Sequence, residues 1–174
     1  MTRDSIDRLF LDYSAIKLEE LASRMETCLT ALSDSQVWSR GGENENAIGN
    51  LVLHLCGNVR QWILSGVGGV PDERQRDREF AARAGASNVE LSERLRATIK
   101  EARAVISSVP AERLSDRLVI QGYDVSVLEA IYHVVEHFSM HAGQIIFATK
   151  MLTGADLGFY QHLQAPAKRE AKAP

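Results

Sequence analysis

The chain has 174 residues, 45% of them hydrophobic and 25% charged, so it can bury a core without disulfide bonds and is neither disordered nor fibrous in composition. Its formal charge of −3, with arginines interleaved among acidic residues, argues against nucleic-acid binding. Neither a signal-peptide pattern nor an apolar run of membrane-spanning length occurs, so we expect a cytoplasmic protein without membrane association.

The first predicted helix covers residues 5–32, where apolar side chains recur at mostly helical spacing. The polar segment 34–45 predicts a connection, with Trp38 as its anchor and Asn46 as the cap of the helix that follows. That second helix spans residues 47–65 and is ended by the sequence GVGGVPD.

The two cysteines, Cys28 and Cys56, both fall inside these helical patterns. A secreted disulfide framework is therefore not indicated. We predict reduced, buried thiols.

Residues 72–85 carry too much charge for a core segment and predict a surface loop or irregular helix that Phe80 holds down. Ser87 and Glu90 have the spacing of a capping box, in which each residue satisfies a backbone N–H of the other. This box opens a third helix, which ends near residues 109–110.

Short β-favouring runs in residues 118–125 surround Gln-Gly and predict a small hairpin. A second capping box, Ser126 with Glu129, then opens the last long helix, which continues to about residue 152. A short helix is expected after it.

Four long helices in series need one another to bury their apolar faces, so the sequence predicts an all-α four-helix bundle with a short β-hairpin before its last helix. The sequence has no internal repeat, and its composition does not change along the chain in a way that would mark a second domain. We expect a single domain over residues 1–165 and a flexible C-terminal tail over residues 166–174. The bundle has more apolar residues than its own core requires, and this favours pairing of two chains as a homodimer.

Histidines are concentrated in the last long helix, where His133, His137 and His141 follow one another at a spacing of four. This spacing brings Cβ atoms within roughly 5–6 Å, so two imidazoles can chelate one ion. Because His133 and His141 are roughly 12 Å apart along the axis, all three cannot share it. A pH-sensitive interface or a polar helix flank is the alternative interpretation.

A further ligand must come from another helix, and His54 lies just beside the apolar arc of residues 47–65. If the two helices pack together, three neutral nitrogens can hold a metal and leave a coordination position for water or substrate. Asn58, Gln61 and Gln144 are placed to orient these ligands or a bound water by hydrogen bonds, although such residues are commonly solvated boundary positions.

Three segments carry a resemblance to a known family: IGNLVLHLCGNVRQW around His54, RDREF at residues 76–80, and HVVEHFSMHAGQI at residues 133–145. With the order of the helices, they resemble the DinB/YfiT-like superfamily of four-helix bundles over nearly the whole chain. The paired-histidine block followed by Gly-Gln is the most specific part.

The resemblance implies a metal triad of His54, His137 and His141, with His133 as a neighbour and a candidate substrate contact. Many relatives have arginine directly after the final histidine, where this sequence has Ala142. This departure alters the rim of the site and with it any inference about the substrate.

The superfamily includes S-transferases that use low-molecular-weight thiols, a maleylpyruvate isomerase branch and many members without an assigned activity. By resemblance, we expect one divalent metal ion that activates a thiol or water in a transferase or hydrolase acting on a small molecule. Zinc and nickel are favoured, whereas iron, copper and manganese stay open, and no catalytic residue is identified.

Two other functions use the same residues. A three-histidine site can also serve a non-catalytic metal-binding stress-response or sensor protein. More remotely, residues 133–137 match H-x-x-E-H, a metalloprotease signature in which Glu136 is the general base. That mechanism needs a downstream carboxylate ligand, for which only Asp156 and Glu170 are available.

Overall fold

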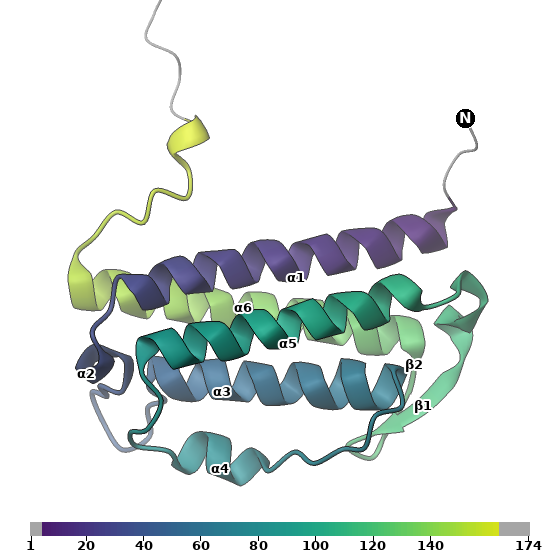
Figure 1. The fold of residues 1–174 in the computed structure, drawn as a ribbon, viewed down its shortest axis with the longest axis horizontal. Helices are drawn as coiled ribbons and strands as arrows, with labels where there is room; N and C mark the ends of the chain where they lie inside the picture. Colours follow the sequence, from purple (N-terminus) through teal and green to yellow (C-terminus); the bar gives the residue numbers. More distant parts are fainter. Residues whose placement is uncertain (1–4, 164–174) are drawn as a thin grey trace, which may run out of the picture.

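Four long helical segments lie side by side and form the body of the molecule (Figure 1). The computed structural model describes residues 5–163. The four segments are α1 (Ile6–Thr30), α3 (Ile48–Val59) with its continuation η1 (Arg60–Val67), α5 (Asn88–Ser108) and α6 (Val127–Thr153). The predicted all-α four-helix bundle is confirmed. The predicted flexible tail, residues 166–174, lies outside the described residues.

Both predicted capping boxes are present at the starts of α5 and α6. The hydroxyl of Ser87 accepts from the backbone N–H of Glu90, and that of Ser126 accepts from the N–H of Glu129. α6 ends at Thr153, and the next residue, Gly154, has a φ of 66°, the left-handed conformation that commonly stops a helix. Local sequence therefore sets where these two helices begin.

The predicted cap of the second helix was wrong. Ala47, not Asn46, is the N-cap of α3, and its N–H donates to Oδ1 of Asn50 at 3.1 Å. The Asn50 side chain thus satisfies the N–H of the N-cap residue itself, whereas no side chain caps the first turn of α3 from the N-cap position.

The second helix is also longer than predicted, because helical backbone continues as the π-helix η1 to Val67. Gly66 lies in η1 against Ile120, where a Cβ would overlap the isoleucine Cδ1. The absence of a side chain at Gly66 lets the following hairpin pack against this end of the helix.

The connections contain short helices that the sequence did not predict individually. α2 (Asp34–Val37) lies within the segment expected to be a connection, and a capping box of Ser33 and Gln36 starts it. Next to it, Trp38 packs over Gly49, and its Nε1 donates to the carbonyl of Ala86 at 2.9 Å. Trp38 is therefore the anchor that the sequence suggested.

The charged segment after η1 contains α4 (Arg76–Ala81), which lies along α3 on the side away from α1 (Figure 1). The sequence predicted either a surface loop or an irregular helix for this segment, and the structure has a short helix. This places charged residues of a connection directly against the second long helix.

The predicted hairpin is formed by β1 (Arg117–Ile120) and β2 (Tyr123–Ser126), which pair antiparallel. Gln121 and Gly122 have φ values of 55° and 82°, as a tight two-residue hairpin turn requires. The hairpin follows η2 (Ala111–Ser115) and leads directly into α6, while η3 (Gln161–Leu163) is the short helix near the C-terminal end.

Buried apolar side chains from all four long segments form the core, with α1 and α3 each packed against α5 and α6. Cys28 and Cys56 are free and buried in it, as predicted. Burial raises the pKa of both thiols, that of Cys56 to about 11. No helix in residues 5–163 combines the length and the apolar character needed to cross a membrane.

Candidate metal centre

The imidazoles of His54, His137 and His141 converge where α3 and α6 pack together. Nε2 of His137 lies 3.2 Å from Nε2 of His54 and 3.0 Å from Nε2 of His141. The three candidate ligand atoms all lie within 4.8 Å of one another. Two helices thus bring together three nitrogens from positions far apart in the sequence.

Packing of the core sets this convergence. Phe138 and Ala142, each next to a cluster histidine in the sequence, are fully buried and fix the rotation of α6. The spacing of four then aligns His137 with His141 along the edge of the core. On α3, the buried Leu55 fixes the rotation of the helix in the same way, so that His54 faces α6.

The separation of the nitrogens suits a metal ion. Metal–nitrogen bonds of about 2.0–2.1 Å place neighbouring ligand nitrogens roughly 3 Å apart. The distances from His137 to the other two histidines match this value. The donor set is therefore compatible with one divalent ion bound by three imidazoles.

The environment of the cluster favours neutral histidines. Burial, followed by the proximity of His141 and His54, lowers the pKa of His137 to about 3. Burial is also the main cause that lowers the pKa of His141. Because only a neutral imidazole can donate a lone pair to a metal, these shifts keep both α6 histidines available as ligands at neutral pH.

The second nitrogen of His54 contacts a carboxylate that the sequence analysis did not identify. Nδ1 of His54 lies 3.2 Å from Oε2 of Glu79, in α4. Arg74 donates to both carboxylate oxygens of Glu79 at 2.8 Å, from Nε and from Nη2. All three side chains are largely buried, with exposures of 7%, 11% and 4% for His54, Glu79 and Arg74.

This arrangement selects one tautomer of His54. Burial alone would raise the pKa of Glu79, but hydrogen bonds from Arg74 and His54 outweigh it and hold the pKa below its ordinary value. An ionised carboxylate accepts the proton on Nδ1, which leaves the lone pair of Nε2 directed at the cluster. Although Nη2 of Arg74 is also 3.1 Å from Nδ1, its hydrogen bond to Glu79 is the shorter contact. Such carboxylate–histidine pairs commonly orient metal ligands.

His137 and His141 differ in the surroundings of their Nδ1 atoms. Nδ1 of His141 lies 2.7 Å from Oε1 of Gln144, so a proton on Nδ1 is donated to the amide and Nε2 is again free for the cluster. Nδ1 of His137 is buried without a hydrogen-bond partner among residues 5–163. Gln144, one of the predicted orienting residues, is therefore in direct contact with a cluster histidine.

The other predicted orienting residues make no direct hydrogen bond to a cluster histidine in the described part of the chain. Oε1 of Gln61 accepts from Nη1 of Arg74 at 2.9 Å, so Gln61 reaches His54 only through that arginine. Asn58 is buried, but within the described part of the chain its Oδ1 has no hydrogen-bond partner.

His133 lies beside the cluster rather than in it. Its ring is 4.1 Å from that of Trp62 and stacks 5.5 Å from that of His137, between centroids. Its nitrogens do not belong to the converging group found among the described residues. The pairing of His137 with His141 is thus the one that meets His54.

Three contacts hold α4 against the site. Nδ2 of Asn50 donates to the carbonyls of Glu79 and Ala82, at 2.8 and 2.9 Å, which fixes the C-terminal end of α4 on α3. The ring of Phe80 packs 4.7 Å from that of His54. Gly57, one turn beyond His54, leaves the space that the Glu79 carboxylate occupies. The signals for Glu79 in the sequence were its place in the RDREF segment and the polar Asn50 on an apolar helix.

The three histidines of the cluster differ in burial. His54 is buried, whereas His137 and His141 are only partly buried. Three protein nitrogens with access for another group are typical of a metal site that binds water or substrate as its fourth ligand.

The chain matches one family and shares its fold with a solved structure. Residues 5–167 match a family described as "Protein of unknown function (DUF1572)". No curated protein matches the chain. A crystal structure of a conserved protein from Enterococcus faecalis is similar with a TM-score of 0.69 and 16% identity, over 88% of this chain and 100% of that one. At this identity, the similarity shows the fold alone.

Proposed function

Because this chain belongs to the DUF1572 family of unknown function, we propose its activity from the site itself: one divalent metal ion bound by His54, His137 and His141, in a transferase or hydrolase acting on a small molecule. The observation that carries the proposal is the convergence of three Nε2 atoms, with the Nδ1 atoms of His54 and His141 next to acceptors.

When bound, the ion would supply Lewis-acid chemistry, polarising a substrate oxygen or lowering the pKa of a water or thiol. The residues around it have separate tasks. Glu79 holds the tautomer of His54, and Gln144 does the same for His141. Phe80 and Arg74 keep the His54 ring and the carboxylate in place and exclude water from that side. The partly exposed side next to His137 and His141 is where the substrate enters.

We further propose that the chain is a branch of the DinB/YfiT-like superfamily. The four-helix architecture and the positions of His54, His137 and His141 support this assignment. The resemblance favours a low-molecular-weight thiol as co-substrate. Three imidazoles suit zinc, nickel, iron and copper alike, and of these we propose zinc or nickel. A homodimer and a cytoplasmic location belong to the same proposal.

The metal proposal is tested by replacing each histidine with alanine and measuring bound metal per chain in the purified proteins. His54→Ala, His137→Ala and His141→Ala are each expected to lose most of the metal. His133→Ala is the matched control, since it removes an imidazole one turn from His137 and should keep nearly full occupancy. Full occupancy in His137→Ala, or loss of metal in His133→Ala, contradicts the ligand assignment.

Catalysis is tested separately, with metal-loaded protein and a panel of small thiols, electrophiles and hydrolysable esters. Turnover that depends on the metal and disappears in His141→Ala supports the enzyme. Full metal occupancy without turnover of any thiol or ester favours the alternative, a non-catalytic metal-binding stress-response or sensor protein.

A further inference from the structure

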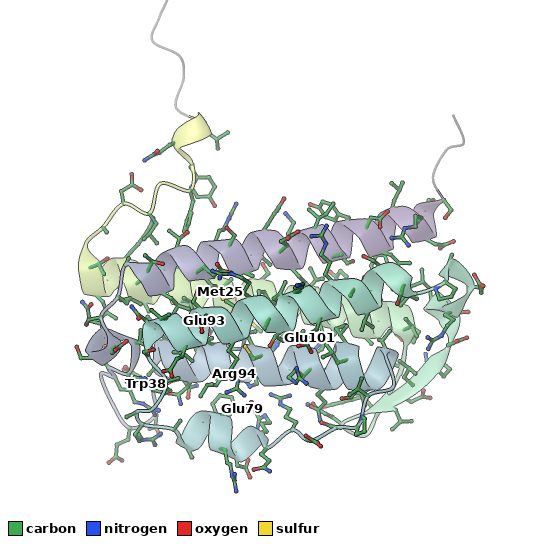
Figure 2. All side chains as sticks on the ribbon, in the orientation of Figure 1. Met25, Trp38, Glu79, Glu93, Arg94 and Glu101 are labelled. Atoms are coloured by element: carbon green, nitrogen blue, oxygen red, sulfur yellow. The ribbon has the colours of Figure 1, made fainter. Side chains whose placement is uncertain are left out.

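A cavity of about 470 Å³ lies between α3 and η1, the segment of residues 70–79, and α5. This volume is within the usual range of small-molecule sites, about 300–1,000 Å³. Arg74 and Glu79 form part of its wall, so the cavity adjoins the candidate metal centre but is separated from it by their side chains. In Figure 2, Arg94 from α5 and Glu79 from α4 lie close to each other over α3.

Arginines dominate the polar part of the cavity wall. Its charged side chains are four arginines and three acidic residues: Arg60, Arg74, Arg78, Arg94, Asp72, Glu73 and Glu79. The carboxylate of Glu79 is fully engaged by Arg74. Asp72 accepts from Nε2 of Gln61 at 2.7 Å and from the backbone N–H of Arg74. Two of the three acidic groups are therefore already satisfied within the protein.

The arginines are less well satisfied. Arg78 and Arg94 make no side-chain hydrogen bond or ion pair with any residue of the described chain. Arg60 pairs with Glu101 at 3.0 Å, but both side chains are about half exposed, and such surface pairs contribute little stability. Up to three guanidinium groups from three elements can therefore turn toward a ligand in this cavity.

The apolar part of the wall is formed by Leu53, Leu64, Val70 and Pro71. A ligand that matches both parts has a charged head and a short hydrocarbon body. Guanidinium groups bind carboxylates and phosphates through paired hydrogen bonds, which makes an anion the complementary head group.

We propose that this cavity binds a small organic anion, a phosphate, phosphonate or carboxylate with a short apolar body, on Arg78 and Arg94. This site is separate from the metal. Reaching the histidines from the cavity would require breaking the contacts of Glu79 with Arg74 and His54. The anion is therefore held behind the ligand His54 and does not coordinate the ion.

Phenylphosphonate is a suitable probe, because it has the charged head and an apolar ring and is not a hydrolysable ester. Titration of the metal-loaded protein, followed by calorimetry, is expected to show saturable binding. Inorganic phosphate should bind more weakly because it lacks the apolar body, and benzyl alcohol should not bind because it lacks the charge. Arg78→Gln and Arg94→Gln should each weaken phenylphosphonate binding about tenfold, since each removes a charged donor.

Arg96→Gln is the matched control, since Arg96 is on the same helix as Arg94 but pairs with Glu26, outside the cavity. It should bind phenylphosphonate like the unmodified protein, and all three variants should retain their metal. Binding of equal strength in Arg78→Gln, Arg94→Gln and the unmodified protein would place the anion elsewhere, for example on the metal, and overturn the proposal. No binding to the unmodified protein overturns it as well.

Discussion

At the scale of single residues, Glu79 lies between the guanidinium group of Arg74 and the imidazole of His54. Its carboxylate accepts from Arg74 on one side and faces Nδ1 of His54 on the other. Without the carboxylate, Arg74 would be left to donate to Nδ1, which would place the His54 proton on Nε2, toward the cluster. The charge of Glu79 thus decides whether His54 can act as a ligand.

We predict that Glu79→Gln weakens metal binding about 10–100-fold, the usual effect of removing a carboxylate that orients a metal-bound histidine. Competition with a chromogenic chelator measures the affinity. Glu73→Gln is the control, since Glu73 belongs to the same segment but makes no hydrogen bond to His54. Equal affinities of the two variants would show that Glu79 does not orient the ligand.

At the scale of elements, α4 can place the Glu79 side chain against α3 because α3 has a glycine, Gly57, at that position. A Cβ on Gly57 would overlap Oε1 of Glu79 and lie 2.8 Å from its Cδ and 3.0 Å from Nε of Arg74. Neither side chain can retreat freely, since they bind each other and His54. Gly57 is therefore part of the site although it carries no chemistry.

We predict that Gly57→Ala displaces Glu79, weakens metal binding as Glu79→Gln does, and destabilises the fold by about 1–3 kcal/mol through overpacking. Gly143→Ala is a matched control: Gly143 is in α6 beside His141, and a Cβ there meets nothing within 4 Å. This control should keep its metal and gain up to about 1 kcal/mol from helix propensity. Thermal unfolding and metal content measure both effects, and unchanged metal affinity in Gly57→Ala would contradict the prediction.

At the scale of the whole molecule, the histidine cluster links α3 to α6, two segments whose sequence separation is large. His54 and His137 are 83 positions apart. An ion bound to both would be lost when the helices separate, because the unfolded chain has no preformed site. Metal binding should therefore stabilise the entire bundle and not only one helix.

We predict that zinc or nickel at a free concentration 100 times Kd raises the free energy of unfolding by about 2.7 kcal/mol. For a chain of this size, each kcal/mol of added stability raises Tm by roughly 2–4 °C. Thermal scans with and without metal measure the shift. It should persist in His133→Ala and vanish in His137→Ala. An equal shift in both variants would mean that the metal binds elsewhere.

The sequence by itself determined the bundle, the capping boxes, the hairpin and the grouping of histidines on α6, because each follows from neighbouring residues in one helix or turn. Ser126 with Glu129, or His137 with His141, interact at fixed helical spacing. Only the tertiary structure decided that Glu79 and Arg74 complete the surroundings of His54 and that His133 stacks between Trp62 and His137. These relations depend on how α4 docks over Gly57 and on how α6 is rotated by its buried Phe138, and no local spacing specifies the packing of one element on another.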